Sequence, residues 1–290
     1  MELNFIKLNP TQNMTVLIKN ENANIGRESY PDIARRIMAY DSVYAEQVGF
    51  IEKPVGGAFG RIHMAGGEFC GNATMSLAAF KVWENKQIEN KSVVVPLESS
   101  GSENIVKCEV KLTENPNAFF CALQAPCPQK IEEIELPVND SMKKFQAVFL
   151  PGITHIIVPV KTVEQMRGGS HGFAERSAKE WERYIKEDAF GIILYDNEAS
   201  YITPLVRVKP TIDALGNSSG GSLVWERGCG SGSAALGAYL SSLSDEKSIT
   251  VHVSQPGGVI DVRTVRDGGK LTSLTISGIV NIAAQGVAYI

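Results

Sequence analysis

The amino-acid sequence predicts an α+β fold made of two pseudo-symmetric domains, each a curled sheet wrapped around one central helix. Three observations support this: a segment of the chain occurs twice, the helix in each copy is apolar nearly all round, and the chain has 290 residues. A helix that is apolar on all sides must be enclosed by other elements. At roughly 150 residues per domain, the length fits two domains that each bury a core.

The repeated segment begins with a Cys-Gly pair in both copies. Residues 70–80 align with residues 229–239, and more than half of the chain separates the two cysteines. Downstream, the β-rich run 91–101 aligns with 247–257, and each run ends in a glycine. A helix and the strand that follows it are therefore duplicated together, and two copies are too few for a solenoid. We expect two similar domains with a cleft between them, where small-molecule sites commonly form.

The domain boundary is marked by prolines and by a change in charge. Pro126 and Pro128 precede the charged run 130–135. We expect an N-terminal domain over residues 1–126, to which the β-like segment 279–290 returns, and a C-terminal domain over residues 127–278.

The other elements are predicted from periodicity and turn residues. In the first domain we expect a hairpin over 5–19 and a helix over 31–40, with Pro31 in its first turn and Tyr40 on its apolar face. In the second domain we expect an amphipathic helix over 175–188 and a loop rich in Gly, Ser and Asn over 213–222. Further strands are expected over 46–52, 61–64, 149–160, 192–195 and 201–208.

Composition and charge exclude several classes of partner. The formal net charge is −4 and the sequence has no basic stripe, so we expect no nucleic-acid partner. No apolar run reaches about 18 residues and the first residues lack a signal region, so we expect no membrane partner and a cytoplasmic location. The expected partner is a small-molecule amino acid substrate. The oligomeric state is left open between a monomer and a homodimer.

The five cysteines do not predict a disulfide scaffold or a metal site. Their number is odd and no Cys-x-x-Cys spacing occurs, so we expect reduced thiols and no metal. Cys108, Cys121 and Cys127 lie in strand-like or proline-flanked segments and are interpreted as small buried hydrophobic residues. The four histidines show no mutual spacing for a metal or for a nucleophile and its base, and we assign them no chemistry.

Cys70 and Cys229 stand where a thiol becomes reactive. The N–H groups at a helix N-terminus stabilise a thiolate and bind anions, so we expect both thiol pKa values to fall toward neutrality. The residues after each cysteine, Gly71-Asn72 and Gly230-Ser231, could cradle a carboxylate. One thiolate could then remove a proton from Cα while the opposite thiol delivers another. This chemistry requires no cofactor. The alternatives are a small residue in a tight turn and a redox dithiol.

At these residues the chain resembles the cofactor-independent amino-acid racemases of the diaminopimelate epimerase fold. The resemblance implies mostly antiparallel sheets, an acid/base pair formed by Cys70 and Cys229, and binding of the α-amino-acid end by neighbouring asparagines and glycines. The matching segments run the whole length of the chain: Lys7-Leu8 through Asn13, Gln47-Val48, Cys70-Gly71-Asn72, Trp225 through Gly228, Cys229 through Gly232, and Pro256-Gly257-Gly258.

The chain departs from the diaminopimelate epimerase pattern where that family holds the second amino-acid end of its substrate. The segment between Arg227-Gly228 and Cys229 is shortened, Met64 stands where an asparagine is expected, and residues 152–155 replace an Asn-Pro-His turn. We therefore expect a substrate with a single carboxylate, and diaminopimelate epimerisation is the alternative within the same chemistry.

Within this fold the chain is similar to the histidine racemases of opine-type metallophore biosynthesis, with which it shares residues 46–52, 68–76 and 255–258. The resemblance implies that Glu46 receives the imidazole, which donates hydrogen bonds and can be cationic. The substrate-binding residues are then expected to be Asn13, Glu46, Gln47, Gly71, Asn72, Glu226, Arg227, Gly230 and Ser231. Without a binding role, these polar residues would be solvated turn, strand-end or salt-bridged residues.

Two functions from other classes compete with racemisation. A non-catalytic amino-acid-binding protein would keep the carboxylate cradles but would not need both sulfurs. A redox dithiol protein would show a stable disulfide between Cys70 and Cys229 under mild reductant. Proline racemases and phenazine-pathway isomerases share the fold, but the latter lack the paired cysteines. The sequence favours histidine racemisation.

Overall fold

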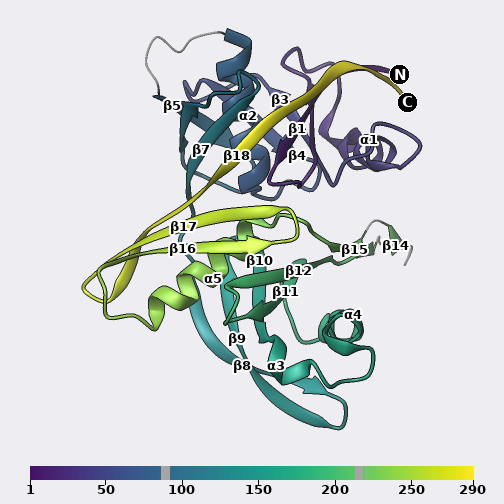
Figure 1. Cartoon of the computed structure of the whole chain (residues 1–290). Coiled ribbons are helices and arrows are strands. Elements are labelled where there is room, and N and C mark those ends of the chain that lie inside the picture. The colour runs from purple at the N-terminus through teal and green to yellow at the C-terminus, as the bar shows by residue number, and fades with distance from the viewer. Residues whose placement is uncertain (86–91, 213–217, 220) are drawn as a thin grey trace. The chain divides into compact units, whose positions relative to one another are not determined.

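The computed structural model describes residues 1–85, 92–212, 218–219 and 221–290. These residues form two compact units (Figure 1). Unit 1 comprises Met1–Ala125 and Thr275–Ile290, and unit 2 comprises Pro126–Leu274. The boundary therefore lies one residue before the expected one, and the chain returns to unit 1 four residues earlier than expected. Most of the loop expected over 213–222 lies outside the described residues.

Unit 1 is built on a sheet that closes on itself. Its strands follow in the order β1 to β7 and then β18, and β18 also pairs with β1. Pairing is antiparallel for most neighbours and parallel for β2 with β3 and for β4 with β5. The strands are β1 (Glu2–Pro10), β2 (Thr15–Lys19), β3 (Gln47–Glu52), β4 (Gly60–Met64), β5 (Ser92–Ser99), β6 (Val106–Leu112), β7 (Ala118–Ala125) and β18 (Lys270–Tyr289).

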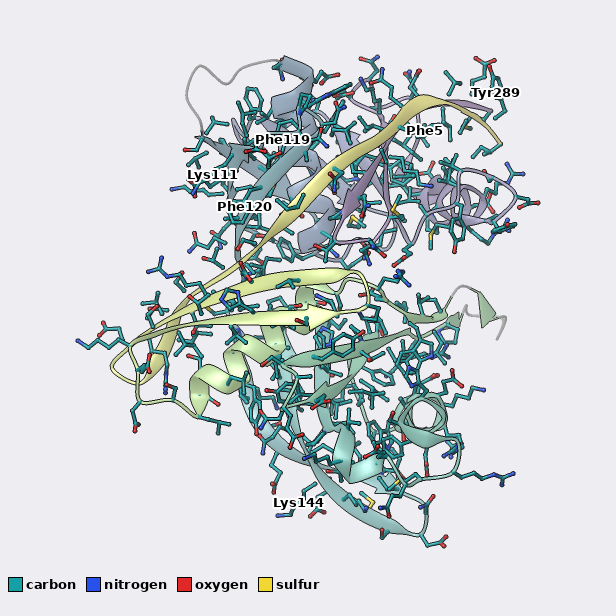
Figure 2. The ribbon with its side chains drawn as sticks, in the orientation of Figure 1. Phe5, Lys111, Phe119, Phe120, Lys144 and Tyr289 are labelled. Carbon is teal, nitrogen blue, oxygen red and sulfur yellow. The ribbon has the colours of Figure 1, made fainter. Side chains whose placement is uncertain are left out.

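The long strand β18 completes this ring along β1. Phe5 pairs with Gly286, and a Cβ added at Gly286 would lie 3.4 Å from Cε1 of the Phe5 ring (Figure 2). On β7 neighbouring aromatic residues take opposite faces. Phe119 is buried, whereas Phe120 lies outside with the Lys111 ammonium 5.7 Å from its ring centre. This alternation distinguishes an interior from an exterior of the sheet.

The interior of unit 1 holds helix α2 (Gly71–Asn85). It contacts strands β1 to β7, and every residue from Gly71 to Phe80 is buried. In unit 2 helix α5 (Gly230–Ser242) packs against β9, β10, β16 and β17, and most of its residues are buried on all sides. A central apolar helix with sheet around it is the arrangement that the sequence predicted, and the α+β fold class is confirmed.

Outside the ring of unit 1, η1 (Arg27–Ser29) leads into helix α1 (Tyr30–Met38). This helix packs on β3 and buries Ile33, Ala34 and Ile37. The predicted range of 31–40 was wrong at its end. Ala39 leaves the helical conformation with ψ near 142°, so Tyr40 is 88% exposed instead of lying on the apolar face.

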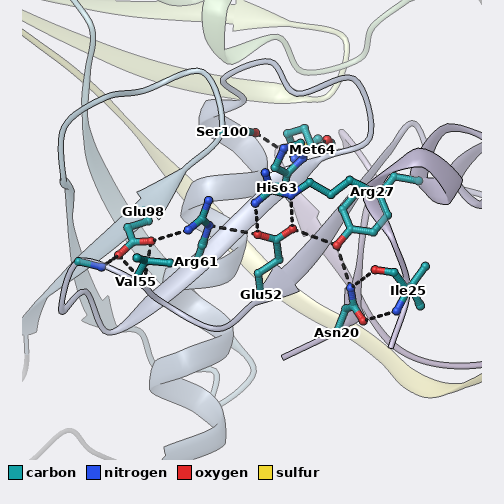
Figure 3. A network of polar contacts seen from close by, with 12 residues as sticks. Asn20, Ile25, Arg27, Glu52, Val55, Arg61, His63, Met64, Glu98 and Ser100 are labelled. Atoms are coloured by element: carbon teal, nitrogen blue, oxygen red, sulfur yellow. Dashed lines mark hydrogen bonds and ion pairs between the residues drawn. The ribbon is translucent and has the colours of Figure 1, made fainter. Parts of the chain in front are cut away.

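A polar network ties the start of α1 to β3 and β4 (Figure 3). The Glu52 carboxylate accepts hydrogen bonds from Arg27 Nη2 at 2.6 Å and from Tyr30 Oη at 3.0 Å, and Arg61 Nε lies 3.1 Å from it. Burial acts to raise the pKa of Glu52, but the hydrogen bonds from Arg27 and Tyr30 outweigh it and lower the pKa. Burial raises the pKa of Tyr30 to about 12. The network holds a charged cluster at the edge of the unit.

Unit 2 contains a sheet in the order β8, β9, β10, β11, β12, β16, β17 and the start of β18, with β15 paired to β12. Strand β10 is parallel to β11, and the other neighbours from β8 to β12 are antiparallel. The strands are β8 (Lys130–Val138), β9 (Ser141–Leu150), β10 (Ile153–Pro159), β11 (Ala189–Asp196), β12 (Tyr201–Val208), β15 (Ser222–Trp225), β16 (Ser248–Gln255) and β17 (Gly258–Asp267), and β13 (Thr211–Ile212) pairs with β14 (Ser218–Ser219) in a separate ribbon.

Two further helices belong to unit 2, the short α3 (Val160–Val163) and α4 (Gly169–Trp181). α4 packs on β8, β11 and β12, and Trp181 lies fully buried in the core there. The predicted helix over 175–188 is correct in type but wrong in its bounds, because the helix begins six residues earlier and ends at Trp181.

The close packing of α5 against β17 gives a stability test. A Cβ at Gly237 would lie 2.3 Å from Val262 Cγ1. Helix propensity alone favours alanine over glycine by up to about 1 kcal/mol. The steric overlap should outweigh this gain in helix propensity. We therefore expect Gly237→Ala to lower the free energy of unfolding by about 1–3 kcal/mol. The urea midpoint followed by circular dichroism measures the change.

The double variant Gly237→Ala with Val262→Ala provides the control. Removing the valine methyl groups makes room for the new Cβ, so the double variant should be more stable than the sum of the two single changes allows. Simple additivity of the two changes would contradict the packing argument.

Candidate active site

Cys70 precedes the first residue of α2 and caps that helix with both its sulfur and its carbonyl. The Ala73 N–H points at Cys70 Sγ at 3.4 Å. The Thr74 N–H and the Thr74 hydroxyl both donate to the Cys70 carbonyl, at 3.0 and 2.7 Å. The sulfur is half-buried and faces the helix N-terminus, where N–H donors stabilise negative charge.

Cys229 repeats this geometry at the N-cap of α5. Its sulfur accepts from the Gly232 N–H at 3.3 Å. The Ser233 N–H and the Ser233 hydroxyl donate to the Cys229 carbonyl at 3.0 and 2.8 Å. The two copies in the sequence therefore give the two thiols the same helix-capping geometry, each at the start of its central helix.

Unit 1 brings three of the sequence-predicted polar residues together with Cys70 in two hydrogen-bonded pairs. The Cys70 thiol donates to Gln47 Oε1 at 2.7 Å. One residue earlier, Glu46 Oε2 accepts from Asn13 Nδ2 at 3.2 Å. Both Glu46 and Gln47 bond through their N–H groups to Met14 O, which sets them beside the turn that carries Asn13. Asn13 is fully buried, and its Oδ1 has no hydrogen-bond partner among the described residues.

The residues after Cys70 are held tightly. Gly71 has no room for a side chain, because a Cβ there would lie 2.6 Å from Ile276 Cδ1. Asn72 follows it and is 2% exposed. The predicted cradle Gly71-Asn72 is thus built into the packed core of unit 1 at the start of α2.

In unit 2 the segment before Cys229 is fixed by contacts to the turn between β16 and β17. Arg227 Nη2 donates to Pro256 O at 3.1 Å, and the Gly257 N–H donates to Arg227 O at 2.6 Å. The Glu226 N–H donates to Pro204 O at 3.0 Å. The Glu226 carboxylate forms a hydrogen bond with the Cys229 thiol. Glu226 is therefore a neighbour of Cys229 in space as well as in sequence, whereas Arg227 fixes the segment to the turn between β16 and β17.

His155 is a site residue that sequence reasoning missed. We assigned no chemistry to the histidines, but His155 Nε2 lies 2.9 Å from Ser231 Oγ, and that hydroxyl lies 3.6 Å from Cys229 Sγ. Strand pairing sets His155 opposite Gly191, where a Cβ would lie 2.2 Å from the imidazole Nδ1. A glycine in β11 thus admits a histidine from β10. Such a long-range fit leaves no signal in the local sequence.

The expectation of a lowered thiol pKa was wrong for Cys229. Burial raises the pKa of the Cys229 thiol well above its ordinary value, and the charge and hydrogen bond of Glu226 raise it further. The Ser231 hydroxyl and the Gly232 N–H lower it, but by less. The thiol is 2% exposed, so loss of hydration outweighs the helix N-terminus. Burial also lowers the pKa of His155 to about 3, so its imidazole is neutral near pH 7.

Other features of the described chain lie away from the cysteines. A cavity of about 500 Å³ in unit 1 is lined by Arg27, Arg61, His63, Ser99 and residues of loop 100–105, without either site cysteine. Cys108 and Cys121 are buried as expected, whereas Cys127 is half-buried, and the five cysteines, all within the described ranges, form no disulfide with one another. Within the described ranges no group of His, Cys, Asp and Glu could hold a metal ion, and no helix is long and apolar enough to cross a membrane.

The fold and the relatives described below together define an isomerase of the racemase and epimerase class. Solved structures share the fold over nearly the whole chain at low identity. A probable proline racemase from Agrobacterium radiobacter K84 matches with a TM-score of 0.68 and 12% identity, over 99% of this chain and 92% of that one. A predicted epimerase from Pseudomonas aeruginosa matches with a TM-score of 0.62 and 13% identity, over 98% of both chains.

The chain belongs to the histidine racemase family. The family model described as the histidine racemase CntK N-terminal domain matches residues 2–289. The histidine racemase of Staphylococcus aureus (strain Mu50) is 30% identical over 99% of this chain and 98% of its own length. A histidine racemase of Fusobacterium nucleatum subsp. nucleatum is also 30% identical, over 99% of this chain and 97% of its own.

The buried imidazole predicts a specific pH dependence of stability. His155 has a pKa of about 3 when folded and an ordinary value near 6.5, so between these values the unfolded chain binds more protons than the folded chain. The stability that the neutral, buried His155 allows is present above pH 6.5 and is lost as the pH falls toward 3. The free energy of unfolding should fall by a few kcal/mol over this range.

The variant His155→Gln tests this contribution, because glutamine keeps an N–H donor for Ser231 but does not titrate. Its urea midpoint should fall less steeply than that of the wild type between pH 6.5 and 4. Parallel curves for the two proteins would contradict the argument.

Proposed function

We propose that this racemase inverts the Cα centre of histidine by a two-cysteine acid/base mechanism that requires no pyridoxal cofactor. The observation that carries the proposal is the duplicated site. Cys70 and Cys229 each present a sulfur to an N–H of their own helix, at 3.4 and 3.3 Å, and each has its carbonyl bound by the residue four positions later. Two thiols at corresponding helix positions are what inversion by two opposed bases requires.

The reaction balances with these groups alone. One sulfur, as thiolate, removes the α-proton and becomes a thiol, while the electron pair stays on Cα and spreads into the carboxylate. The other sulfur, as thiol, then delivers its proton to the opposite face of Cα and becomes a thiolate. The positive end of a helix dipole and its N-terminal N–H groups stabilise the negative charge that develops on the carboxylate. The enantiomer that is bound decides which sulfur is the base.

Substrate charge offsets the raised pKa of Cys229. In the unliganded chain the thiolate is disfavoured by burial and by Glu226. An α-ammonium bound near these groups lowers the pKa of the thiol, because an opposite charge favours the ionised form. The neutral imidazole of His155 can donate through Nε2 to Ser231, which leaves the Ser231 hydroxyl proton to point at the sulfur. Ionisation of Cys229 is thereby coupled to substrate binding.

The assignment of histidine as the substrate is supported by the relatives and by the pair Asn13 and Glu46. The Glu46 carboxylate is half-buried and held by Asn13, so it presents a fixed acceptor to an imidazole N–H. The buried Asn13 Oδ1 offers a second acceptor for an N–H of the substrate. An imidazole N–H is a donor that both acceptors can bind.

The mechanism predicts the exchange pattern of cysteine variants in D2O. Wild-type enzyme should exchange the α-proton of both L-histidine and D-histidine. Cys70→Ser and Cys229→Ser should each lower racemisation by about 10²–10⁴-fold, because each removes one acid/base group. Proton NMR of the Cα signal, with each enantiomer offered separately to reduced enzyme, measures this.

Cys127→Ser is the matched control, because Cys127 is a half-buried thiol outside the site. It should exchange at the wild-type rate. Racemisation at the wild-type rate by Cys70→Ser or Cys229→Ser would contradict the two-cysteine mechanism. Exchange of diaminopimelate or proline in preference to histidine would contradict the substrate assignment.

Glu46→Gln tests recognition of the side chain. The amide keeps the size of the residue but removes the charge, so kcat/KM for histidine should fall by about 10–100-fold. Steady-state racemisation followed by polarimetry measures this, and Glu28→Gln, at an exposed carboxylate of the same unit, should not alter it. Unchanged kinetics in Glu46→Gln would show that the imidazole is bound elsewhere.

A further inference from the structure

We propose that Gln255 is a positioning residue for Cys229, which holds the N-cap of α5 in place so that the sulfur is correctly aimed. Gln255 is the last residue of β16 and is 4% exposed. This inference rests on the proposed acid/base role of Cys229.

The amide of Gln255 serves both backbone polar groups of Cys229. Its Oε1 accepts from the Cys229 N–H at 2.7 Å. Its Nε2 donates to Ser233 Oγ at 3.1 Å, and that hydroxyl donates to the Cys229 carbonyl at 2.8 Å. The orientation of the amide is fixed by these partners, since a flipped amide would place its NH₂ group against the Cys229 N–H.

These contacts fix the position of the sulfur through the backbone. Gln255 does not touch the sulfur, which is bound by the Gly232 N–H and lies near Ser231. If the N-cap moves, Cys229 Sγ moves with it relative to the Cα atom of a bound substrate. A displacement of about 1 Å can lower a rate by about 10²-fold.

The first copy has a simpler version of the same contact. In the alignment of the two copies Gln255 corresponds to Ser99. The Ser99 hydroxyl lies 3.1 Å from Thr74 Oγ1, and Thr74 donates to the Cys70 carbonyl at 2.7 Å. The longer glutamine adds a direct bond to the N–H of its cysteine. A change at Gln255 should therefore affect Cys229 and spare Cys70, and a change at Ser99 should do the reverse.

The test compares Gln255→Met, Gln255→Glu and Ser99→Ala. Methionine keeps the length of the side chain and loses both hydrogen bonds, whereas glutamate keeps an acceptor for the Cys229 N–H. The first measurement is the alkylation rate of each cysteine by iodoacetamide without substrate, resolved by mass spectrometry of the peptides. The second is kcat and KM for histidine, with circular dichroism to confirm folding.

In Gln255→Met we expect alkylation of Cys229 to rise several-fold, because the freed N-cap opens more often, while that of Cys70 stays unchanged. The value of kcat should fall by about 10–100-fold with a smaller change in KM. The fall in kcat should be smaller for Gln255→Glu than for Gln255→Met. If Gln255→Met does not fold, Gln255→Glu is the variant that tests the proposal. Ser99→Ala should change alkylation at Cys70 and not at Cys229.

Equal changes at both cysteines would show general loosening and overturn the proposal, as would unchanged Cys229 alkylation and unchanged kcat in both Gln255 variants. Failure of the proposed function is a separate result. If Cys229→Ser still racemises histidine, the acid/base role falls, whereas the alkylation pattern still reports whether Gln255 holds Cys229.

Discussion

The enclosure of two apolar helices is the constraint on which the rest of this structure depends. A helix with no polar face can be buried only if strands surround it, and in unit 1 the sheet does so by closing, with β18 pairing to both β7 and β1. Enclosure leaves the helix ends as the places where its unpaired backbone groups can meet a ligand. Cys70 and Cys229 occupy those ends, so the packing requirement also determines where the proposed proton transfer would take place.

The parts of this arrangement that depend on local pattern could be predicted from the sequence. The repeated Cys-Gly start and the uninterrupted apolar run revealed α2, α5 and both cysteines, and Asn13, Glu46 and Gln47 were identified from a motif resemblance. The environment of Cys229 could not be predicted in this way. His155 reaches Ser231 only because β10 lies beside β11 with Gly191 opposite, and residues 155, 191 and 231 are far apart in the chain.

The same limit applies to the electrostatics of the site. A helix N-terminus favours a thiolate, and this was the only influence on the thiol pKa that the sequence revealed. The structure adds the burial of Cys229 and the nearby Glu226 carboxylate. Both raise the pKa of the thiol, and together they outweigh the helix N-terminus. A thiol that ionises reluctantly when unliganded is also less exposed to oxidation, because the thiolate is the form that reacts. Burial thus protects the proposed acid/base thiol from oxidation between turnovers.

The closure of unit 1 by β18 also bears on how the chain folds during synthesis. The segments of unit 2 leave the ribosome before residues 275–290, and until those residues emerge β1 and β7 each lack one neighbour. Unit 2 can therefore form its core first, although it lies later in the chain, while the first 125 residues wait with two unpaired strand edges. The ring of unit 1 can thus be completed only after unit 2 has been synthesised, although unit 1 begins the chain.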